Sequence, residues 1–482
     1  MTQAPELPAH IGDLVGPVIR DLTRRSGHDL NRWIQQVHRL GGCREPIRLT
    51  GHIHTLDTHT GEILGHYSTR AEPHGQLLIR CGNRRATRCP ACAEVYRRDT
   101  FHLIRSGLLG GDKGVPETVR THPRVLATFT APSFGAVHRG PGKDGQAVPC
   151  HPRRTGPACF ERHAAGDPCI GQPLDPDAYD YVGQVLWNAH AGDLWRRFTI
   201  YLRRHLAASA GLTRKAFNEA VRLSFAKVAE YQARGVVHFH AIIRLDGRTS
   251  DGVLTPAPDW ATVDMLSSAI HSAAKAVRLD GADFGQPGRE LTWGDQVDVV
   301  PISPRDLGHS LALSEHAVAG YVAKYATKAA EVSGTLDRPV KTRELNSLEA
   351  QGVPEHAARL IRTAWELGDP VTHPELVGLR LRNWAHMLGF RGHFSTKSRS
   401  YSTTLTKLRQ ARTDFRLRIA QTRRPYDPDS TLILGSWTYA GQGFTPGEAA
   451  LTAQLADDPP SIAGPGSTPV SPPARCAEGV SQ

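Results

Sequence analysis

The feature that most constrains the fold of this 482-residue chain is a β-rich stretch, LSFAKVAEYQARGVVHFHAIIRL, at residues 223–245. Two runs rich in β-branched and aromatic side chains flank Ala-Arg-Gly, and Gly235 suits a positive φ, so the stretch predicts an antiparallel hairpin. Alternation along the second strand places His238 and His240 on one face. A type I turn with a glycine bulge would place Glu230 opposite His238.

This histidine pair predicts a metal site on the hairpin. Two imidazoles on one face of a strand can bind a single divalent ion, and Glu230 would add a carboxylate. The alternative is two ordinary exposed histidines, since the chain has 24 of them. The apolar setting VVHFHAII favours metal ligation, because buried imidazoles need polar partners.

A second candidate segment is SEHAVAGYVAKYATKAAE at residues 314–331. Its alanine-rich composition and its serine start predict a helix. Tyr321 and Tyr325 are four residues apart and share a face, and Lys324 and Lys328 form the adjoining stripe. The alternative is core aromatics beside a solvated edge. A tyrosine beside a metal and lysines can instead attack a phosphate, because cations stabilise phenolate and phosphate oxygens.

Cysteines predict a zinc site near the N-terminus. Residues 81–92 read CGNRRATRCPAC and contain Cys81, Cys89 and Cys92. A Cys-x-x-Cys turn lets two thiolates bind one tetrahedral zinc, and Cys81 is close enough to be a third ligand. The alternative is buried unpaired cysteines or a redox pair. The candidates for the fourth ligand are Cys43, His52, His54 and His74.

A second group has metal-ligand residue types without a Cys-x-x-Cys, inside an irregular Pro- and Arg-rich insertion at residues 139–177. Whether this group binds a second zinc ion stays an open question. The group comprises Cys150, His151, Cys159, His163 and Cys169.

The net charge of +11 is unevenly distributed. From residue 425 onward there are six acids and one basic residue, which leaves +16 on residues 1–424. Residues 386–424 hold ten basic residues and one acid, and this run favours a nucleic-acid surface. Aromatic residues that interrupt the run strengthen that interpretation; they are Phe390, Phe394, Tyr401 and Phe415. Pro, Gly and Ser dominate from about residue 445, so the acidic tail is expected to be largely disordered.

No apolar run of the roughly 18 residues needed to span a membrane occurs, and no secretory signal is visible. We therefore expect a cytoplasmic protein without a membrane partner.

Three motifs in order resemble those of the HUH endonuclease superfamily. They are VLATFTAPS at residues 125–133, HFH at 238–240 and YVAKYATK at 321–328. Within that superfamily the chain is most similar to rolling-circle replication initiators of actinobacterial plasmids. Its paired tyrosines are similar to those of phage rolling-circle initiators. The resemblance covers roughly residues 40–400.

The resemblance implies an α+β fold with an antiparallel-sheet HUH core and helices on one side. We expect an N-terminal zinc-binding region at 1–118, the endonuclease domain at 119–335, a basic helical DNA-binding region at 336–424 and the acidic tail at 425–482. The insertion at 139–177 would interrupt the endonuclease domain.

The implied activity is site-specific nicking and rejoining of one DNA strand at a plasmid origin through a 5′-phosphotyrosine. Tyr325 is the first choice of nucleophile, and Tyr321 stands where some single-tyrosine initiators carry a glutamate. Mg²⁺ or Mn²⁺ is expected at the histidine site and Zn²⁺ at the cysteines. Expected partners are single-stranded origin DNA and a host DNA polymerase. A host helicase is also expected, because the chain lacks GxxxxGK[ST].

Other functions remain as alternatives. A conjugative relaxase would use the same chemistry. A zinc-finger DNA-binding regulator would explain the charge and the cysteines, but not HFH together with the tyrosine pair. A metal hydrolase is disfavoured, because no further His or Asp ligand motif accompanies HFH.

Overall fold

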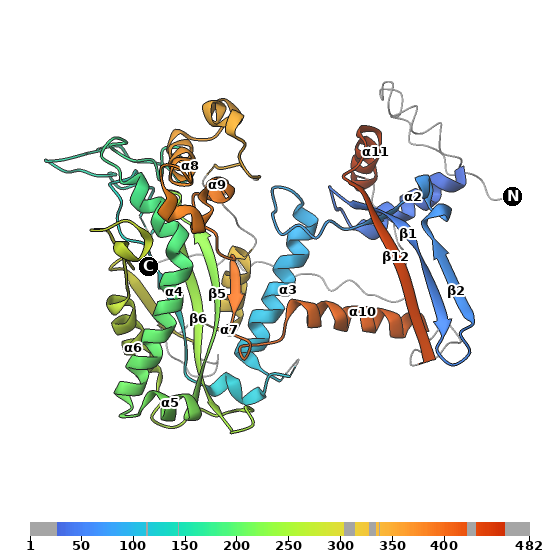
Figure 1. Ribbon diagram of the computed structural model, residues 1–482, viewed down its shortest axis with the longest axis horizontal. Helices are drawn as coiled ribbons and strands as arrows, with labels where there is room; N and C mark the ends of the chain where they lie inside the picture. The colour runs from blue at the N-terminus through green and yellow to red at the C-terminus, as the bar shows by residue number, and fades with distance from the viewer. Residues whose placement is uncertain are drawn as a thin grey trace, which may run out of the picture. The chain divides into compact units, whose positions relative to one another are not determined.

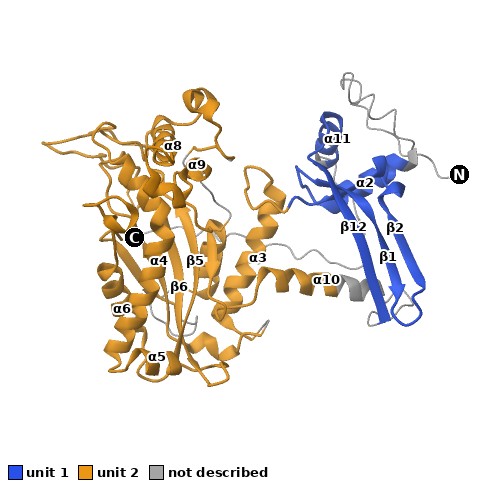
Figure 2. Ribbon diagram, viewed as in Figure 1, with its two compact units in different colours: residues 1–81, 427–482 blue, residues 82–426 orange. Residues whose placement is uncertain are grey.

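The computed structural model describes residues 27–111, 114–142, 144–302, 314–326, 334–336, 338–421 and 430–457. The chain divides into two compact units, which Figure 2 distinguishes by colour. Unit 1 combines residues 1–81 with 427–482, and unit 2 comprises residues 82–426. No helix in the described ranges is long and apolar enough to cross a membrane.

Unit 2 is built on a six-stranded antiparallel sheet with the order β10-β4-β6-β5-β11, and β7 pairs with β6 (Figure 1). The hairpin predicted from the sequence forms its centre as β5 and β6. The strands are β4 (Arg124–Phe129), β5 (Val221–Tyr231), β6 (Val237–Arg248), β7 (Leu254–Thr255), β10 (Val297–Pro301) and β11 (Ser395–Lys397). A separate two-stranded sheet pairs β8 (Arg278–Asp280) with β9 (Glu290–Thr292).

Helices cover both faces of this sheet, whereas we expected them on one side. The reason is that the central strands are apolar on both faces, as buried strands are. Phe239 and Ile243 pack into one hydrophobic core, and Ile242 and Val228 into another. The first core includes residues of α4 (Tyr181–Ser209), α6 (Val263–Ala276) and α8 (Glu355–Leu367). The second includes residues of α3 (Pro90–Leu109) and α7 (Glu315–Tyr325).

Unit 1 contains a four-stranded antiparallel sheet with the order β12-β1-β2, in which β3 also pairs with β1. Its strands are β1 (Ile47–Asp57), β2 (Ile63–Ser68), β3 (Leu77–Ile79) and β12 (Thr431–Gln442), and its helices are α2 (Gly27–Leu40) and α11 (Pro446–Asp457). Arg48 of β1 forms a 2.6 Å ion pair with Glu448 of α11. Residues 431–457 thus form regular structure where we expected a largely disordered tail, because β12 pairs along all of β1. Residues 458–482 lie outside the described part.

The basic region at 336–424 is mostly helical, and its strand β11 joins the unit 2 sheet beside β5. Its longer helices are α8 and α10 (Leu405–Gln421), and its α9 (Leu381–Trp384) is a single turn; a short α5 (Arg214–Ala220) follows α4 elsewhere in unit 2. Phe390, Phe394 and Tyr401 are buried, so they are core residues rather than stacking surfaces for bases. Tyr401 also donates a hydrogen bond to the carbonyl of Ile104 at 3.2 Å. The side chain of Phe415 lies outside the described part.

Candidate functional site

The hairpin β5–β6 brings one carboxylate and two imidazoles together. Its register pairs Glu230 with His238, as the glycine turn implies, and Gly235 has a φ of 76°. Oε2 of Glu230 lies 3.0 Å from Nε2 of His238 and 3.1 Å from Nε2 of His240. One ligand atom from each residue lies within 4.8 Å of the others. These three side chains could hold one divalent ion and leave coordination positions open.

Thr128 of β4 fixes the orientation of His240, a role that the sequence analysis missed. The two residues are paired across β4 and β6, and Oγ1 of Thr128 lies 3.1 Å from Nδ1 of His240. A proton on Nδ1 would be donated to this hydroxyl, which leaves Nε2 facing Glu230 as a ligand atom. The position of Thr128 in the motif VLATFTAPS was the available signal.

Helix α7 presents both tyrosines to this cluster. The rings of Tyr321 and Tyr325 lie 5.0 Å and 5.1 Å from the His240 ring, centre to centre, and that of Tyr325 is stacked on it. The Tyr321 hydroxyl lies 3.4 Å from Nε2 of His240. The fold thus brings the histidine and tyrosine motifs side by side, although they are about eighty residues apart in the chain.

Two interactions position the start of α7. The Ser314 side chain accepts a hydrogen bond from the backbone N–H of Ala317, which caps the helix. Glu315 in the first turn forms a 2.7 Å ion pair with Arg124 of β4, and both side chains are buried. A buried pair of this kind is costly to break, because the remaining charge would have no partner. It therefore holds the tyrosine helix against the sheet.

The electrostatics of α7 bear on whether a tyrosine could react. Burial, and then the hydrogen bond with Tyr325, raise the pKa of Tyr321 above its ordinary value. This hydroxyl would need a nearby cation or base before it could attack. Lys324 is exposed, and its Nζ lies 5.9 Å from the centre of the Tyr325 ring. Lys328 lies outside the described residues.

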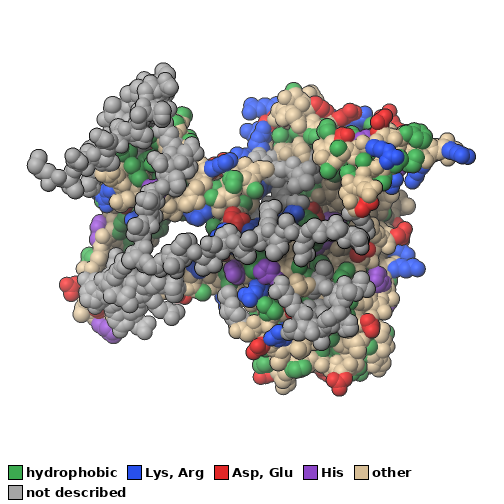
Figure 3. All heavy atoms as spheres, turned by 180° about the vertical axis from the view of Figure 1, so that it is seen from behind, with side chains coloured by type: hydrophobic (Ala, Val, Ile, Leu, Met, Phe, Trp, Pro, Cys, Tyr) green, Lys and Arg blue, Asp and Glu red, His purple; other side chains and the backbone are tan. Residues whose placement is uncertain are grey.

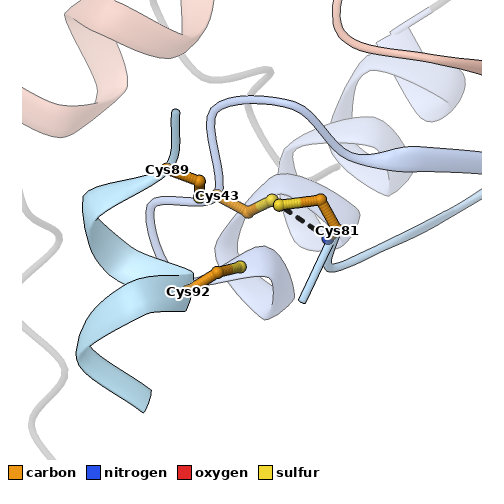
Figure 4. A group of neighbouring side chains, drawn as sticks. All are labelled: Cys43, Cys81, Cys89 and Cys92. Atoms are coloured by element: carbon orange, nitrogen blue, oxygen red, sulfur yellow. Dashed lines mark hydrogen bonds between the residues drawn. The ribbon is translucent and has the colours of Figure 1, made fainter. Parts of the chain in front are cut away.

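Figure 4 shows the cysteine group predicted near the N-terminus. The sulfur atoms of Cys43, Cys81, Cys89 and Cys92 all lie within 4.8 Å of one another. Cys89 and Cys92 come from the start of α3, and the backbone N–H of Cys81 donates to the sulfur of Cys43 at 3.3 Å. Cys43 therefore joins the group, and none of the three candidate histidines does. Four thiolates are a tetrahedral ligand set, so the group could hold a metal ion such as zinc.

The basic region has exposed cations in its loops and on α10. Arg391, Arg399 and Lys407 are exposed. Arg412 also contacts Asp99 of α3 at 2.6 Å, and Arg409 contacts it at 3.6 Å, so part of the positive charge of α10 holds this helix against α3.

Comparison with known proteins gives a match over most of the chain. Residues 29–457 match the family described as RepSA, replication initiator protein, pSAM2. A replication initiator protein of Streptomyces ambofaciens is 49% identical over 457 residues, which is 93% of this chain and 93% of that relative. No solved structure matches the chain.

Proposed function

This chain belongs to the pSAM2 family of replication initiator proteins, and we propose that it nicks and rejoins one DNA strand at its plasmid origin through a phosphotyrosine intermediate. The observation that carries the proposal is the contact of both Tyr321 and Tyr325 with His240, a member of the Glu230, His238 and His240 group. A nucleophile and a divalent-ion ligand set in contact are the two components that phosphodiester transfer to a tyrosine needs. We infer that the antiparallel sheet around them is the core of an HUH-type endonuclease.

Glu230, His238 and His240 would hold Mg²⁺ or Mn²⁺. The Glu230 carboxylate is a ligand type that suits these ions, and the chemistry supplied is polarisation of the scissile phosphate. Thr128 keeps the Nδ1 atom of His240 engaged, so that Nε2 stays available to the ion. Glu230 and His238 have 13% and 15% of their side chains exposed, which allows a phosphate oxygen to approach.

The transfer is a substitution at phosphorus. A tyrosine hydroxyl gives its proton to the solvent, and its Oη forms a bond to the phosphorus. The bond to the 3′ oxygen breaks, and this oxygen takes up a proton to become the 3′-OH that primes a polymerase. Lys324 beside Tyr325, and Lys328, would stabilise the phenolate and the phosphate oxygens. Rejoining is the reverse substitution: a 3′-OH attacks the phosphorus of the phosphotyrosine, the new phosphodiester bond forms, and the tyrosine oxygen leaves and takes up a proton. In a two-tyrosine scheme, the cut made by the second tyrosine frees this 3′-OH.

The two tyrosines are assigned by different arguments. The family motif favours Tyr325 as the first nucleophile. The 3.4 Å contact between the Tyr321 hydroxyl and Nε2 of His240 favours Tyr321. In the paired scheme Tyr325 cuts first and Tyr321 accepts the strand in the second transfer.

Other parts of the chain would serve the same reaction. Single-stranded origin DNA is the reacting substrate, with melting and synthesis supplied by a host helicase and a host polymerase. Cys43, Cys81, Cys89 and Cys92 would hold a structural zinc. The exposed cations in residues 336–424 would contact the DNA backbone, and residues 119–335 would form the endonuclease domain.

The test uses the full chain with Mn²⁺ and a single-stranded oligonucleotide from the origin of its own replicon. The wild-type protein should form a covalent protein–DNA adduct that survives a denaturing gel. Tyr325→Phe and Tyr321→Phe tested singly identify the first nucleophile, and the double variant should form no adduct. Tyr439→Phe is the matched control, because this exposed tyrosine lies in unit 1 on β12.

Two results would reject the proposal. An adduct in the double variant would show that neither tyrosine is the nucleophile. No adduct with wild-type protein, combined with salt-sensitive binding to the same DNA, would favour a DNA-binding regulator without catalysis. If the proposal holds, His240→Ala should lose cleavage and keep salt-sensitive binding to the same DNA.

A further inference from the structure

The insertion between β4 and α4 is long and irregular. In its described residues, which run from 130 to 180 without 143, it forms isolated bridges, Val137 with Pro173 and His151 with Cys159, but no helix or longer strand. It projects from one end of the unit 2 sheet (Figure 1), and Lys and Arg side chains lie along it in Figure 3. Compact domains rarely contain so long a loop without its own source of order. A metal ion bound within the insertion would be one such source of order.

Four side chains converge inside the insertion. Ligand atoms of His138, Cys150, Cys159 and His163 all lie within 4.8 Å of one another. Cys150 is fully buried and His163 is 8% exposed. His138 was absent from the group recognised in the sequence, because it precedes the first cysteine by twelve residues and belongs to no local motif.

The separations between these atoms are close to those around a tetrahedral zinc ion, although one of the three is shorter by about 0.2 Å. Zn–S bonds of about 2.3 Å and Zn–N bonds of about 2.0 Å require ligand atoms to be about 3.3–3.8 Å apart. Nδ1 of His138 lies 3.8 Å from Sγ of Cys150 and 3.1 Å from Nε2 of His163. Nε2 of His163 in turn lies 3.5 Å from Sγ of Cys159. Two thiolates and two imidazoles are a common set for a closed structural site.

The surroundings of the cluster match what a zinc site requires. The other ring nitrogen of His163, Nδ1, lies 3.3 Å from Oδ2 of Asp167, and a carboxylate behind a ligating histidine is a frequent outer partner. The backbone N–H of Arg139 donates to Sγ of Cys150 at 3.3 Å. Cys169 lies 3.1 Å from the same Nδ1 atom of His163, outside the tetrahedron.

The cluster lies in a loop that rests on the catalytic hairpin. A Cβ atom on Gly171 would come within 2.5 Å of the backbone of Ala233, so the loop and the β5–β6 turn are in close contact. Arg234 of this turn also donates to the carbonyl of Pro132 at 3.1 Å. The turn joins the strands that carry Glu230 and His238. A cross-link in the loop would therefore stabilise one end of the hairpin.

We propose that His138, Cys150, Cys159 and His163 bind a structural zinc ion, with Asp167 orienting His163, and that this ion fixes the insertion against the β5–β6 turn. The site is separate from the Cys43 group and from the histidine pair of the hairpin. Its test is metal content, which is measured without DNA and does not depend on nicking.

Zinc per chain should be measured by mass spectrometry of metals in the purified full-length protein. The Cys150→Ala/Cys159→Ala variant should contain one zinc fewer than wild type, and this difference does not depend on occupancy of the Cys43 group. His271→Ala, in an exposed histidine of α6, is the control and should keep the wild-type content. Should the double variant fail to fold, His163→Cys should keep the ion while His163→Ala loses it, because a Cys₃His set also binds zinc.

Three results would overturn the assignment. The first is an unchanged zinc content in the folded double variant and in His163→Ala. The second is loss of the ion in Cys169→Ser or His151→Ala, which would mean a different ligand set. The third is a disulfide between Cys150 and Cys159 in protein purified without reductant, detected by a mass two hydrogens lower.

Discussion

Two groups of metal-ligand side chains in unit 2 are built in opposite ways. Glu230, His238 and His240 lie on the two strands of a regular hairpin and offer three nitrogen and oxygen donors. The group in the insertion offers two sulfurs and two nitrogens from an irregular loop. The difference separates two uses of a metal. Three protein donors leave coordination positions open for a substrate oxygen. Four protein donors fill the coordination sphere of the ion, so that such a metal can only stabilise the conformation of the chain.

The two groups also differ in what positions their ligands. On the hairpin, backbone pairing positions the ligands, and Thr128 across the sheet fixes His240. In the described residues of the insertion, backbone hydrogen bonds form turns and isolated bridges rather than a regular ladder. The ligands would therefore contribute more to the conformation of this loop. Loss of a ligand should therefore mainly affect chemistry in the first group and local order in the second.

The largest expected effect is on the hairpin group. His240→Ala should lower the rate of adduct formation on the order of a thousandfold, because polarisation by a metal is worth several kcal/mol. The zinc content should be unchanged. Timed adduct formation with Mn²⁺ and metal analysis of the same preparation measure both. A loss of zinc together with activity would contradict the independence of the two groups.

Matched changes behind one histidine of each group give the next effect. Thr128→Val and Asp167→Ala each remove an outer partner, and such losses typically weaken metal affinity by roughly 10–100-fold. Thr128→Val should raise the Mn²⁺ concentration needed for nicking, and Thr128→Ser should restore it. Asp167→Ala should release zinc more readily to a coloured chelator. If Thr128→Val changed zinc release, or Asp167→Ala changed the Mn²⁺ requirement, the two groups would not act independently.

A smaller effect concerns the order of the insertion. In Cys150→Ala/Cys159→Ala the loop should open locally, so trypsin should cut after the exposed Arg153 and Arg154 at least about tenfold faster than in wild type. Cleavage elsewhere in unit 2 should be little changed. Mass spectrometry of the early fragments locates the cuts. Equal rates in variant and wild type would mean that the loop is ordered without the ion.

The sequence predicted those features that depend on local patterns. The hairpin, its register and the shared face of Tyr321 and Tyr325 follow from alternation, turn chemistry and helical spacing. Contacts between distant segments were not predictable in this way. Thr128 meets His240 across 112 residues, and Phe390 and Phe394 enter a core that only the complete fold defines. The second layer of helices was missed because both faces of β6 are apolar, which alternation alone does not reveal.

The smallest expected effect tests the opposite face of the hairpin, where Lys227 is buried beside Phe239 with its Nζ 3.5 Å from the ring centre. Burial lowers the pKa of Lys227 from 10.5 to about 7. Between these two values the unfolded chain binds more protons at this lysine than the folded chain does, so stability should rise with pH. The aromatic ring partly compensates the buried charge.

Lys227→Met should therefore raise the free energy of unfolding by about 1 kcal/mol at pH 7, and by less near pH 10, because it removes a buried cation and keeps the packing. Urea denaturation at both pH values measures the change, and Lys407→Met on the exposed surface of α10 is the control. Nicking by Lys227→Met should match wild type, since Lys227 faces away from Glu230 and the histidines. A variant that is less stable at pH 7, or that loses nicking, would mean that the charge on this face supports the site.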